Sequence, residues 1–199
     1  MKIAFVFPGQ GSQSVGMLDS FRDNAAVDSV VARASSALGQ NLGALIATGP
    51  AEDLNLTINT QPALLTAGYA IYAAWRAAGG AEPQIVAGHS LGEYTALVAA
   101  GALELEDAMR LVRFRAQAMQ EAVPLGIGSM AAILGLADEA VQQACSEAAQ
   151  GEVVEPVIFN APAQVVIAGH SSAVQRACEV AKRLGAKRAV PLSVSAPFH

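Results

Sequence analysis

The chain has 199 residues, of which 53% are hydrophobic and 15% charged, and its formal net charge at pH 7 is -5. This composition excludes an intrinsically disordered chain, because disorder requires low hydrophobicity and high charge. The negative charge argues against a nucleic-acid-binding protein, whose contact face needs an excess of lysine and arginine.

The start of the chain is a β-rich run, residues 2–7, which ends at the glycine-containing loop 8–11 (PGQG). This pattern predicts a buried strand that leads into a loop, and loops at such strand ends bind ligands in α/β folds. A helix is predicted over residues 27–38, closed by Gly39, because glycine accommodates the left-handed conformation at helix ends.

The middle of the chain is mainly helical by pattern. Thr60 and Pro62 predict the start of a largely buried helix that runs to Gly79, because a hydroxyl caps the first turn and proline suits it. Residues 84–87 form the next apolar strand candidate, and a further helix is predicted over residues 106–122.

After residue 128, strand and helix patterns alternate in the order β-α-β-β-α-β, which is the ferredoxin-like unit. Each predicted helix has a side chain able to cap it, and a turn at residues 161–164 predicts a hairpin. The predicted strands are 130–134, 157–160, 165–168 and 187–192, and the predicted helices begin at Asp138 and Ser171.

These elements predict an α/β protein with a hydrolase-like larger domain and an inserted ferredoxin-like small domain. The expected boundaries are residues 1–126 for the first part of the larger domain, 127–192 for the small domain, and 193–199 for the return to the larger domain. A monomer is expected.

Cysteine usage and the chain start exclude several other classes. Cys145 and Cys178 lack the spacing of a zinc or redox site, so no metal is expected, and both fall on apolar helical stripes typical of buried thiols. The apolar run at residues 3–7 is too short for a secretory signal, and no stretch approaches the ~20 apolar residues of a membrane span. We therefore expect a cytoplasmic protein without membrane attachment.

The chemistry-bearing motif is GHSLG at residues 88–92, which fits G-x-S-x-G between an apolar strand and a helix. A sharp strand-to-helix turn pushes Ser90 outward at the helix N-terminus, where N–H groups and a partial positive charge suit a developing oxyanion. The alternative is that Ser90 merely caps the helix. A second stretch, GHS at residues 169–171, lacks the final glycine, so Ser171 is rejected as a nucleophile.

A serine nucleophile needs a base within hydrogen-bond reach, and the chain has three histidines. His89 should diverge from its neighbour Ser90, and His170 lies inside the small domain, so His199 is favoured by elimination. Because the acids between Ser90 and His199 look like helix starts, we predict a dyad whose imidazole is oriented by a carbonyl rather than a carboxylate.

Four blocks of sequence carry a resemblance to a known family. FPGQGSQ, TQPALLTA, GHSLGEY and VVIAGH begin at residues 7, 60, 88 and 165. These blocks resemble the malonyl-CoA:acyl-carrier-protein transacylases of fatty-acid synthesis and the related acyltransferase domains of polyketide synthases. The resemblance extends over the whole chain.

The resemblance implies a ping-pong reaction with no bound cofactor. Ser90 takes malonate from malonyl-CoA and passes it to the phosphopantetheine thiol of acyl carrier protein. Gln10 and Leu91 match the positions whose backbone N–H groups stabilise the oxyanion, and Arg115 matches the arginine that binds the free carboxylate. A guanidinium suits this task because it forms two parallel bonds. Without the resemblance, Arg115 reads as part of a solvated helix face with Arg110 and Arg113.

Three further residues are candidates for lining the cleft. Asn160 and His89 could contact substrate or serve as structural hydrogen-bonding residues. Phe198 resembles the phenylalanine of malonyl-selective acyltransferases and could exclude an α-methyl branch, although core packing is an equal alternative.

A basic patch is expected to steer the acidic carrier protein to the enzyme, because complementary charge raises encounter rates. Its members lie at the end of the last predicted helix and the start of the following strand, and they are Lys182, Arg183, Lys187 and Arg188.

The sequence departs from the family at its end, because family members continue well past the catalytic histidine. The chain is therefore expected to be a fragment with weak or absent activity. Two alternatives stay open: a serine esterase or thioesterase, which would not need Arg115, and a non-catalytic carrier-protein-binding fragment.

Overall fold

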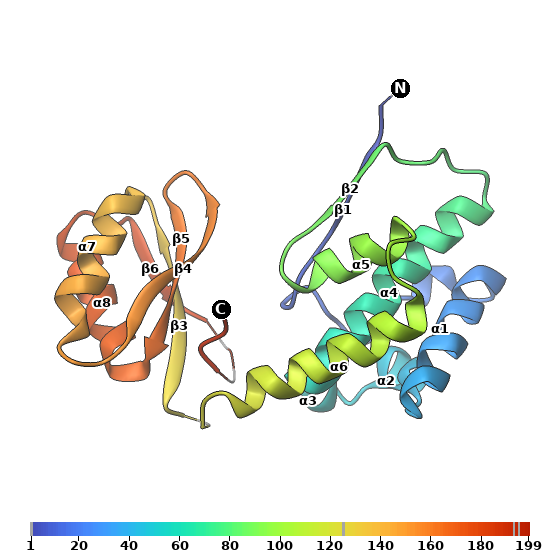
Figure 1. Ribbon diagram of the computed structural model, residues 1–199, viewed down its shortest axis with the longest axis horizontal. Coiled ribbons are helices and arrows are strands. Elements are labelled where there is room, and N and C mark those ends of the chain that lie inside the picture. The colour runs from blue at the N-terminus through green and yellow to red at the C-terminus, as the bar shows by residue number, and fades with distance from the viewer. Residues whose placement is uncertain (1, 125, 193, 195) are drawn as a thin grey trace. The chain divides into compact units, whose positions relative to one another are not determined.

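The computed structural model describes residues 2–124, 126–192, 194 and 196–199. These fall into two compact units, which divide between Ala118 and Met119 inside helix α6, Leu105–Glu121 (Figure 1). The division therefore lies ahead of residue 126, the domain boundary predicted from the sequence. Among the described residues, no helix is both long enough and apolar enough to cross a membrane.

The first unit combines a small parallel sheet with a helical core. Its two strands pair in parallel from Ala4 against Ile85 to Phe7 against Gly88. Phe5 and Phe7 pack with Tyr72, while Val6 between them is 74% exposed, so the strand alternates sides as its pleat requires. The elements are β1 (Ala4–Phe7), a 3-10 turn (Asp19–Phe21), α1 (Ala25–Leu38), α2 (Leu42–Thr48), α3 (Ala51–Leu54), α4 (Thr57–Ala77), β2 (Ile85–Gly88), α5 (Leu91–Ala99) and α6.

Helix α1 begins and ends where local chemistry allows. The side-chain oxygen of Asn24 accepts hydrogen bonds from the backbone N–H groups of Ala26 and Val27, at 3.1 and 3.3 Å. Gly39 closes the helix in the left-handed conformation, with φ 59°. The predicted helix over residues 27–38 is confirmed and starts two residues earlier.

The predicted start of α4 at Thr60 and Pro62 is wrong, because the helix already begins at Thr57. The Thr60 hydroxyl lies 2.6 Å from the Leu54 carbonyl oxygen and so joins α4 to the preceding helix α3. Pro62 lies inside α4, where it cannot donate a backbone hydrogen bond. The helix is largely buried, as predicted, although Ile71 and Trp75 remain 38% and 41% exposed.

The second unit has the predicted element order β-α-β-β-α-β. Its sheet has the strand order β4-β5-β3-β6, and every neighbouring pair is antiparallel. The predicted hairpin is confirmed, because Ala161 pairs with Gln164. The elements are β3 (Gly128–Leu134), α7 (Asp138–Ala149), β4 (Val154–Ala161), β5 (Gln164–His170), α8 (Ser171–Arg183) and β6 (Arg188–Pro191).

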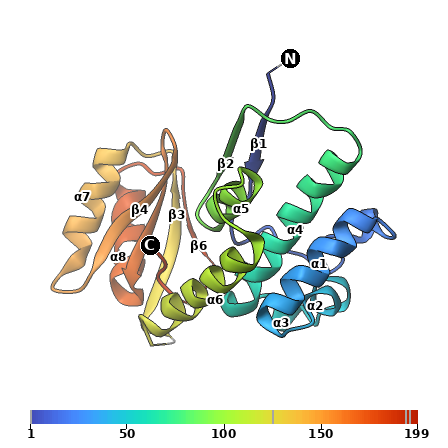
Figure 2. The same cartoon turned by 45° about the vertical axis from the view of Figure 1, so that its right-hand side comes forward.

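The two faces of the second unit's sheet pack against different parts of the chain. Ala131 and Ile133 pack in one cluster with residues of α7 and α8, and Figures 1 and 2 show both helices on the same face. Met130 points to the opposite face, where it packs with Ala196 and Phe198 from the C-terminal segment. Ser193 and Ser195 of the predicted return segment 193–199 lie outside the described residues. The return of this segment to the larger domain stays a prediction.

The predicted caps of α7 and α8 are wrong. Asp138 and Ser171 are the first helical residues, and neither the Ala137 nor the His170 side chain, at the actual cap positions, makes a capping bond. The Ser171 hydroxyl instead donates to the Ile127 carbonyl, at 3.1 Å, and so joins α8 to the segment before β3.

Both thiols are buried, as predicted, and they share one core between α7 and α8. Burial raises the pKa of the Cys145 thiol to about 12, and it raises the pKa of Cys178 as well. Because the thiolate is the reactive form, neither thiol is suited to nucleophilic chemistry in the folded protein.

We therefore expect Cys145 and Cys178 to resist alkylation by iodoacetamide at pH 8 while the protein is folded. Both should react once the protein is unfolded in guanidinium chloride, and mass spectrometry of the tryptic peptides gives the measurement. Rapid modification of either thiol in the native protein would contradict this expectation.

Candidate active site

The turn between β2 and α5 places Ser90 in an unusual backbone conformation. Its φ and ψ are 54° and −110°, a region that residues with a Cβ atom rarely adopt. The Ser90 side chain makes no capping hydrogen bond to α5, so the interpretation of Ser90 as a mere helix cap is wrong. Such local strain is characteristic of functional turns, where the surrounding structure holds it in place.

Glycines permit this turn because backbone segments touch there. A Cβ atom added to Gly88 would lie 1.9 Å from the carbonyl carbon of Gly92. One added to Gly92 would lie 2.1 Å from the carbonyl oxygen of Phe7, and one on Gly9 would lie 2.7 Å from the carbonyl oxygen of His89. The end of β1, the loop after it and the serine turn are therefore in direct backbone contact.

Side-chain amides hold the loop after β1 against the segment that leads into α4. The Gln10 amide donates to the Thr57 hydroxyl at 3.1 Å, and the Gln13 amide donates to the side-chain oxygen of Asn55 at 2.8 Å. Neither Thr57 nor Asn55 was predicted as a site residue from the sequence. The only feature of the sequence that could have indicated them is that they are polar residues just before the TQPALLTA block.

Arg115 extends from α6 to the serine turn. Its Nη2 lies 3.1 Å from Ser90 Oγ, and its Nη1 donates to the side-chain oxygen of Gln61 at 2.7 Å. The guanidinium carbon also lies 5.5 Å from the centre of the Tyr94 ring, within the range of a cation–π contact. Three groups from α4 and the GHSLGEY block thus surround one guanidinium.

The neighbouring arginines have different partners. Arg110 pairs with Asp107 at 2.5 Å on the exposed face of α6, whereas Arg113 donates to Gln40. Burial lowers the pKa of Arg113. The interpretation of Arg115 as part of a solvated arginine face therefore does not hold.

Two other predicted site residues, Leu91 and His89, lie on either side of Ser90 in the chain. Leu91 is the first residue of α5, and its side chain is buried in the helical core. Only its backbone can therefore take part in chemistry at the serine turn. His89 is exposed, and its Nδ1 would lie 3.3 Å from a Cβ atom on Gly9. Its ring therefore lies beside the loop after β1.

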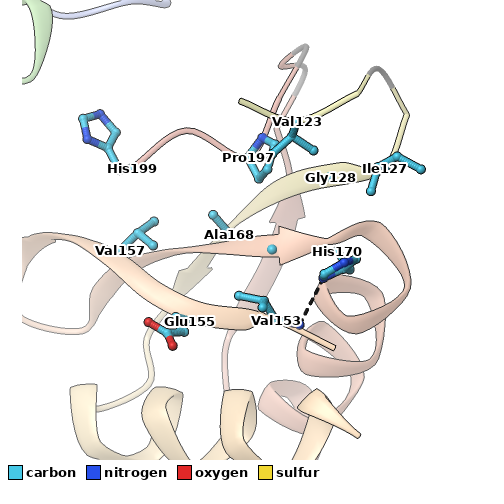
Figure 3. Close-up of a pocket in the computed structure, with 11 residues that line it drawn as sticks. Val123, Ile127, Gly128, Val153, Glu155, Val157, Ala168, His170, Pro197 and His199 are labelled. Atoms are coloured by element: carbon cyan, nitrogen blue, oxygen red, sulfur yellow. Dashed lines mark hydrogen bonds between the residues drawn. The ribbon is translucent and has the colours of Figure 1, made fainter. Parts of the chain in front are cut away.

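In the second unit, His199 lines a pocket of about 330 Å³ (Figure 3). Most of the lining is apolar and includes Val157, Ala168 and Pro197. Figure 3 shows His170 at the opposite end of the pocket from His199, and the Nδ1 atom of His170 accepts a hydrogen bond from the Val153 N–H at 3.0 Å.

The remaining predicted site residues are also in the second unit. Asn160 is exposed near the end of β4. Phe198 is 8% exposed and packs with Met130, Val166 and Ala168, so in this chain it is a core side chain. Ser90 and Arg115 belong to the first unit and His199 to the second, and the Ser90–His199 dyad stays a prediction.

Comparison with known proteins finds one family model, described as an acyl transferase domain, that matches residues 4–198. A malonyl CoA-acyl carrier protein transacylase of Escherichia coli K12 is 58% identical over the whole chain, and one of Bacillus subtilis 168 is 48% identical. The chain spans 64% and 63% of the length of these two relatives.

Solved structures agree with these relatives. An acyl-carrier-protein S-malonyltransferase from Burkholderia pseudomallei 1710b is 68% identical and superimposes with a TM-score of 0.96 over 100% of this chain and 65% of its own. A malonyl-transacylase solved in complex with a type II polyketide acyl-carrier protein is 52% identical, with a TM-score of 0.95, over 99% of this chain and 64% of its own.

The backbone contact at the serine turn generates a stability prediction. Gly92→Ala should lower the free energy of unfolding by about 3 kcal/mol or more, because the new methyl group meets the Phe7 carbonyl, which cannot move aside like a flexible side chain. Gly43→Ala is the matched control, because its methyl group would meet side-chain atoms rather than backbone, a Val31 carbon at 3.1 Å and the Asn41 side-chain oxygen at 3.6 Å. Chemical denaturation measures both, and equal stabilities of the two variants would contradict the prediction.

Proposed function

Because the chain belongs to the acyl transferase domain family, we propose that it transfers a malonyl group from coenzyme A to the phosphopantetheine thiol of acyl carrier protein. The single observation that carries this proposal is the 3.1 Å contact between Arg115 Nη2 and Ser90 Oγ. It places a fixed positive charge beside a serine on a strained turn. A nucleophile and a carboxylate-binding group at one point suit an acyl group that ends in a carboxylate.

The first half-reaction acylates Ser90. Ser90 Oγ attacks the thioester carbonyl of malonyl-CoA while His199 accepts its proton, and the tetrahedral intermediate then expels the coenzyme A thiolate, which takes that proton. The backbone N–H groups of Gln10 and Leu91 stabilise the oxyanion, and Leu91 adds the partial positive charge of the α5 N-terminus. Loss of one such donor typically costs about 100- to 1,000-fold in rate.

The second half-reaction regenerates the serine. The phosphopantetheine thiol loses its proton to His199 and attacks the malonyl ester, and Ser90 Oγ leaves with that proton. Arg115 binds the free carboxylate in both half-reactions, and its planar guanidinium discriminates malonyl from uncharged acyl groups. His199 is oriented by a carbonyl. Asn160 and His89 are the further proposed substrate-binding residues.

We propose that the enzyme has two domains, whose boundary lies a few residues after the division between Ala118 and Met119. Residues 1–126 begin an α/β larger domain of hydrolase type, and residues 127–192 form a ferredoxin-like domain inserted into it. The proposed mechanism requires that His199, which follows the ferredoxin-like domain in the chain, reaches Ser90. The antiparallel order β4-β5-β3-β6 in the second unit supports the ferredoxin-like assignment.

Acyl carrier protein is the proposed partner, and a related malonyl-transacylase has been solved with such a carrier. Lys182, Lys187 and Arg188 are exposed at the end of α8 and the start of β6. Arg183 pairs with Glu147 of α7, which offsets its charge. The steering charge of the basic patch therefore comes mainly from the other three residues.

The first test of this function is the covalent intermediate. Mixing the protein with malonyl-CoA should add the mass of one malonyl group to Ser90, and Ser90→Ala should abolish the adduct in intact-mass measurements. Ser171→Ala is the matched control, because it removes the serine of the other GHS sequence. An adduct that survives in Ser90→Ala, or release of free malonate without an adduct, would sink the proposal, and the second result would indicate a thioesterase.

Arg115 supplies the second test. Arg115→Ala should slow malonyl loading about 100-fold, which corresponds to about 2.7 kcal/mol, because the carboxylate loses its charged partner. Loading from acetyl-CoA should change little. Arg110→Ala is the control from the same helix, and equal losses for malonyl and acetyl groups would argue against carboxylate recognition.

The third test concerns the carrier. The double variant Lys182→Glu, Lys187→Glu should lower kcat/KM for transfer to carrier protein about tenfold at low ionic strength, while loading from malonyl-CoA stays within twofold. Lys2→Glu is the control for a charge change in the first unit. Equal losses in both half-reactions would remove the steering role.

A further inference from the structure

We propose that Gln61 is the positioning residue for Arg115: its side-chain oxygen holds one edge of the guanidinium so that the other edge faces the acyl group on Ser90. This inference rests on the proposed function and adds a residue that the motif-based assignments did not include. It begins from the 2.7 Å bond between Gln61 Oε1 and Arg115 Nη1.

Gln61 is suited to hold another group still. Its side chain is fully buried, at 0% exposure, on α4 between the buried residues Thr60 and Pro62. A buried amide cannot exchange its partner for water, and rotation away from Arg115 would cost it a hydrogen bond to a charged group. The position of Gln61 Oε1 is therefore set by the packing of α4, which contributes Ala63, Leu64 and Leu65 to the first unit's core.

The geometry divides the donors of Arg115 between two tasks. A guanidinium has five N–H groups in one plane. Nη1 is engaged by Gln61 and Nη2 faces Ser90 Oγ at 3.1 Å, while Tyr94 contacts the guanidinium 5.5 Å from its ring centre. When Ser90 is acylated, its oxygen becomes an ester oxygen and a weaker acceptor, so the Nη2 donors turn to the malonyl carboxylate without movement of the anchored edge.

The neutrality of Gln61 matters as much as its position. A carboxylate at this site would hold Nη1 equally well, but it would neutralise the guanidinium and compete with the substrate carboxylate. An amide oxygen provides the acceptor and leaves the positive charge for the substrate. Position and charge can therefore be tested separately.

The experiment compares Gln61→Leu, which removes the acceptor, with Gln61→Glu, which keeps it and adds a negative charge. Each should raise KM for malonyl-CoA about tenfold, the size expected for a weakened contact to a charged group, while kcat changes less. Loading of Ser90 from acetyl-CoA should stay within twofold. Thr66→Val is the control, because it removes a different buried polar group from α4, a hydroxyl that donates to the Pro62 carbonyl rather than to Arg115's partner Gln61.

The outcomes separate this inference from the proposed function. If the wild-type protein forms no malonyl-Ser90 adduct, the proposed function fails. If the wild type is loaded but both variants match it in KM, or lose acetyl and malonyl loading equally, Gln61 has no positioning role and the inference is overturned. If Gln61→Leu unfolds, as judged by circular dichroism, the KM ratio of Gln61→Glu decides the question.

Discussion

The first unit depends on one constraint, which is the direct contact of three backbone segments at the serine turn. The end of β1, the loop after it and the start of α5 lie so close that Gly88 and Gly92 have no room for a side chain. Ser90 adopts its strained conformation at this contact, and its side chain makes no capping hydrogen bond to α5. The parallel pairing of β1 with β2 ends at the same point, at Phe7 and Gly88, so the sheet delivers both segments to one place.

Helix α4 organises the polar groups around this turn. Near its N-terminus, the Thr57 hydroxyl accepts a hydrogen bond from the Gln10 amide. One turn later, the Gln61 side-chain oxygen accepts a hydrogen bond from Arg115. The same helix contributes Leu64 and Leu65 to the hydrophobic core, which fixes its rotation. Because a rigid buried helix carries both acceptors, the loop after β1 and the guanidinium are held relative to the same frame.

The second unit is held together by contacts of a different kind. Its helices bury one face of an antiparallel sheet, and the segment with Ala196 and Phe198 covers part of the other. Arg176 links α8 to the C-terminal end of α7, where it bonds the carbonyls of Ala148 and Ala149, and it also pairs with Glu152. Hydrogen bonds from Ser172 and Arg176 lower the pKa of the half-buried Glu152 carboxylate. These bonds stabilise the second unit, in which His199 lines the pocket.

The sequence by itself determined the local features of this protein. Period-two and helical patterns gave the β-α-β-β-α-β order, glycine at position 39 marked a helix end, and GHSLG identified a strained serine turn, because each depends on residues adjacent in the chain. Tertiary structure alone decided which polar side chains meet. Gln61 and Arg115 are 54 residues apart, and three arginines of α6 look alike in sequence although only Arg115 contacts Ser90. Periodicity states which face of a helix is buried, but the partner on that face is set by packing between distant segments, and so it required the folded coordinates.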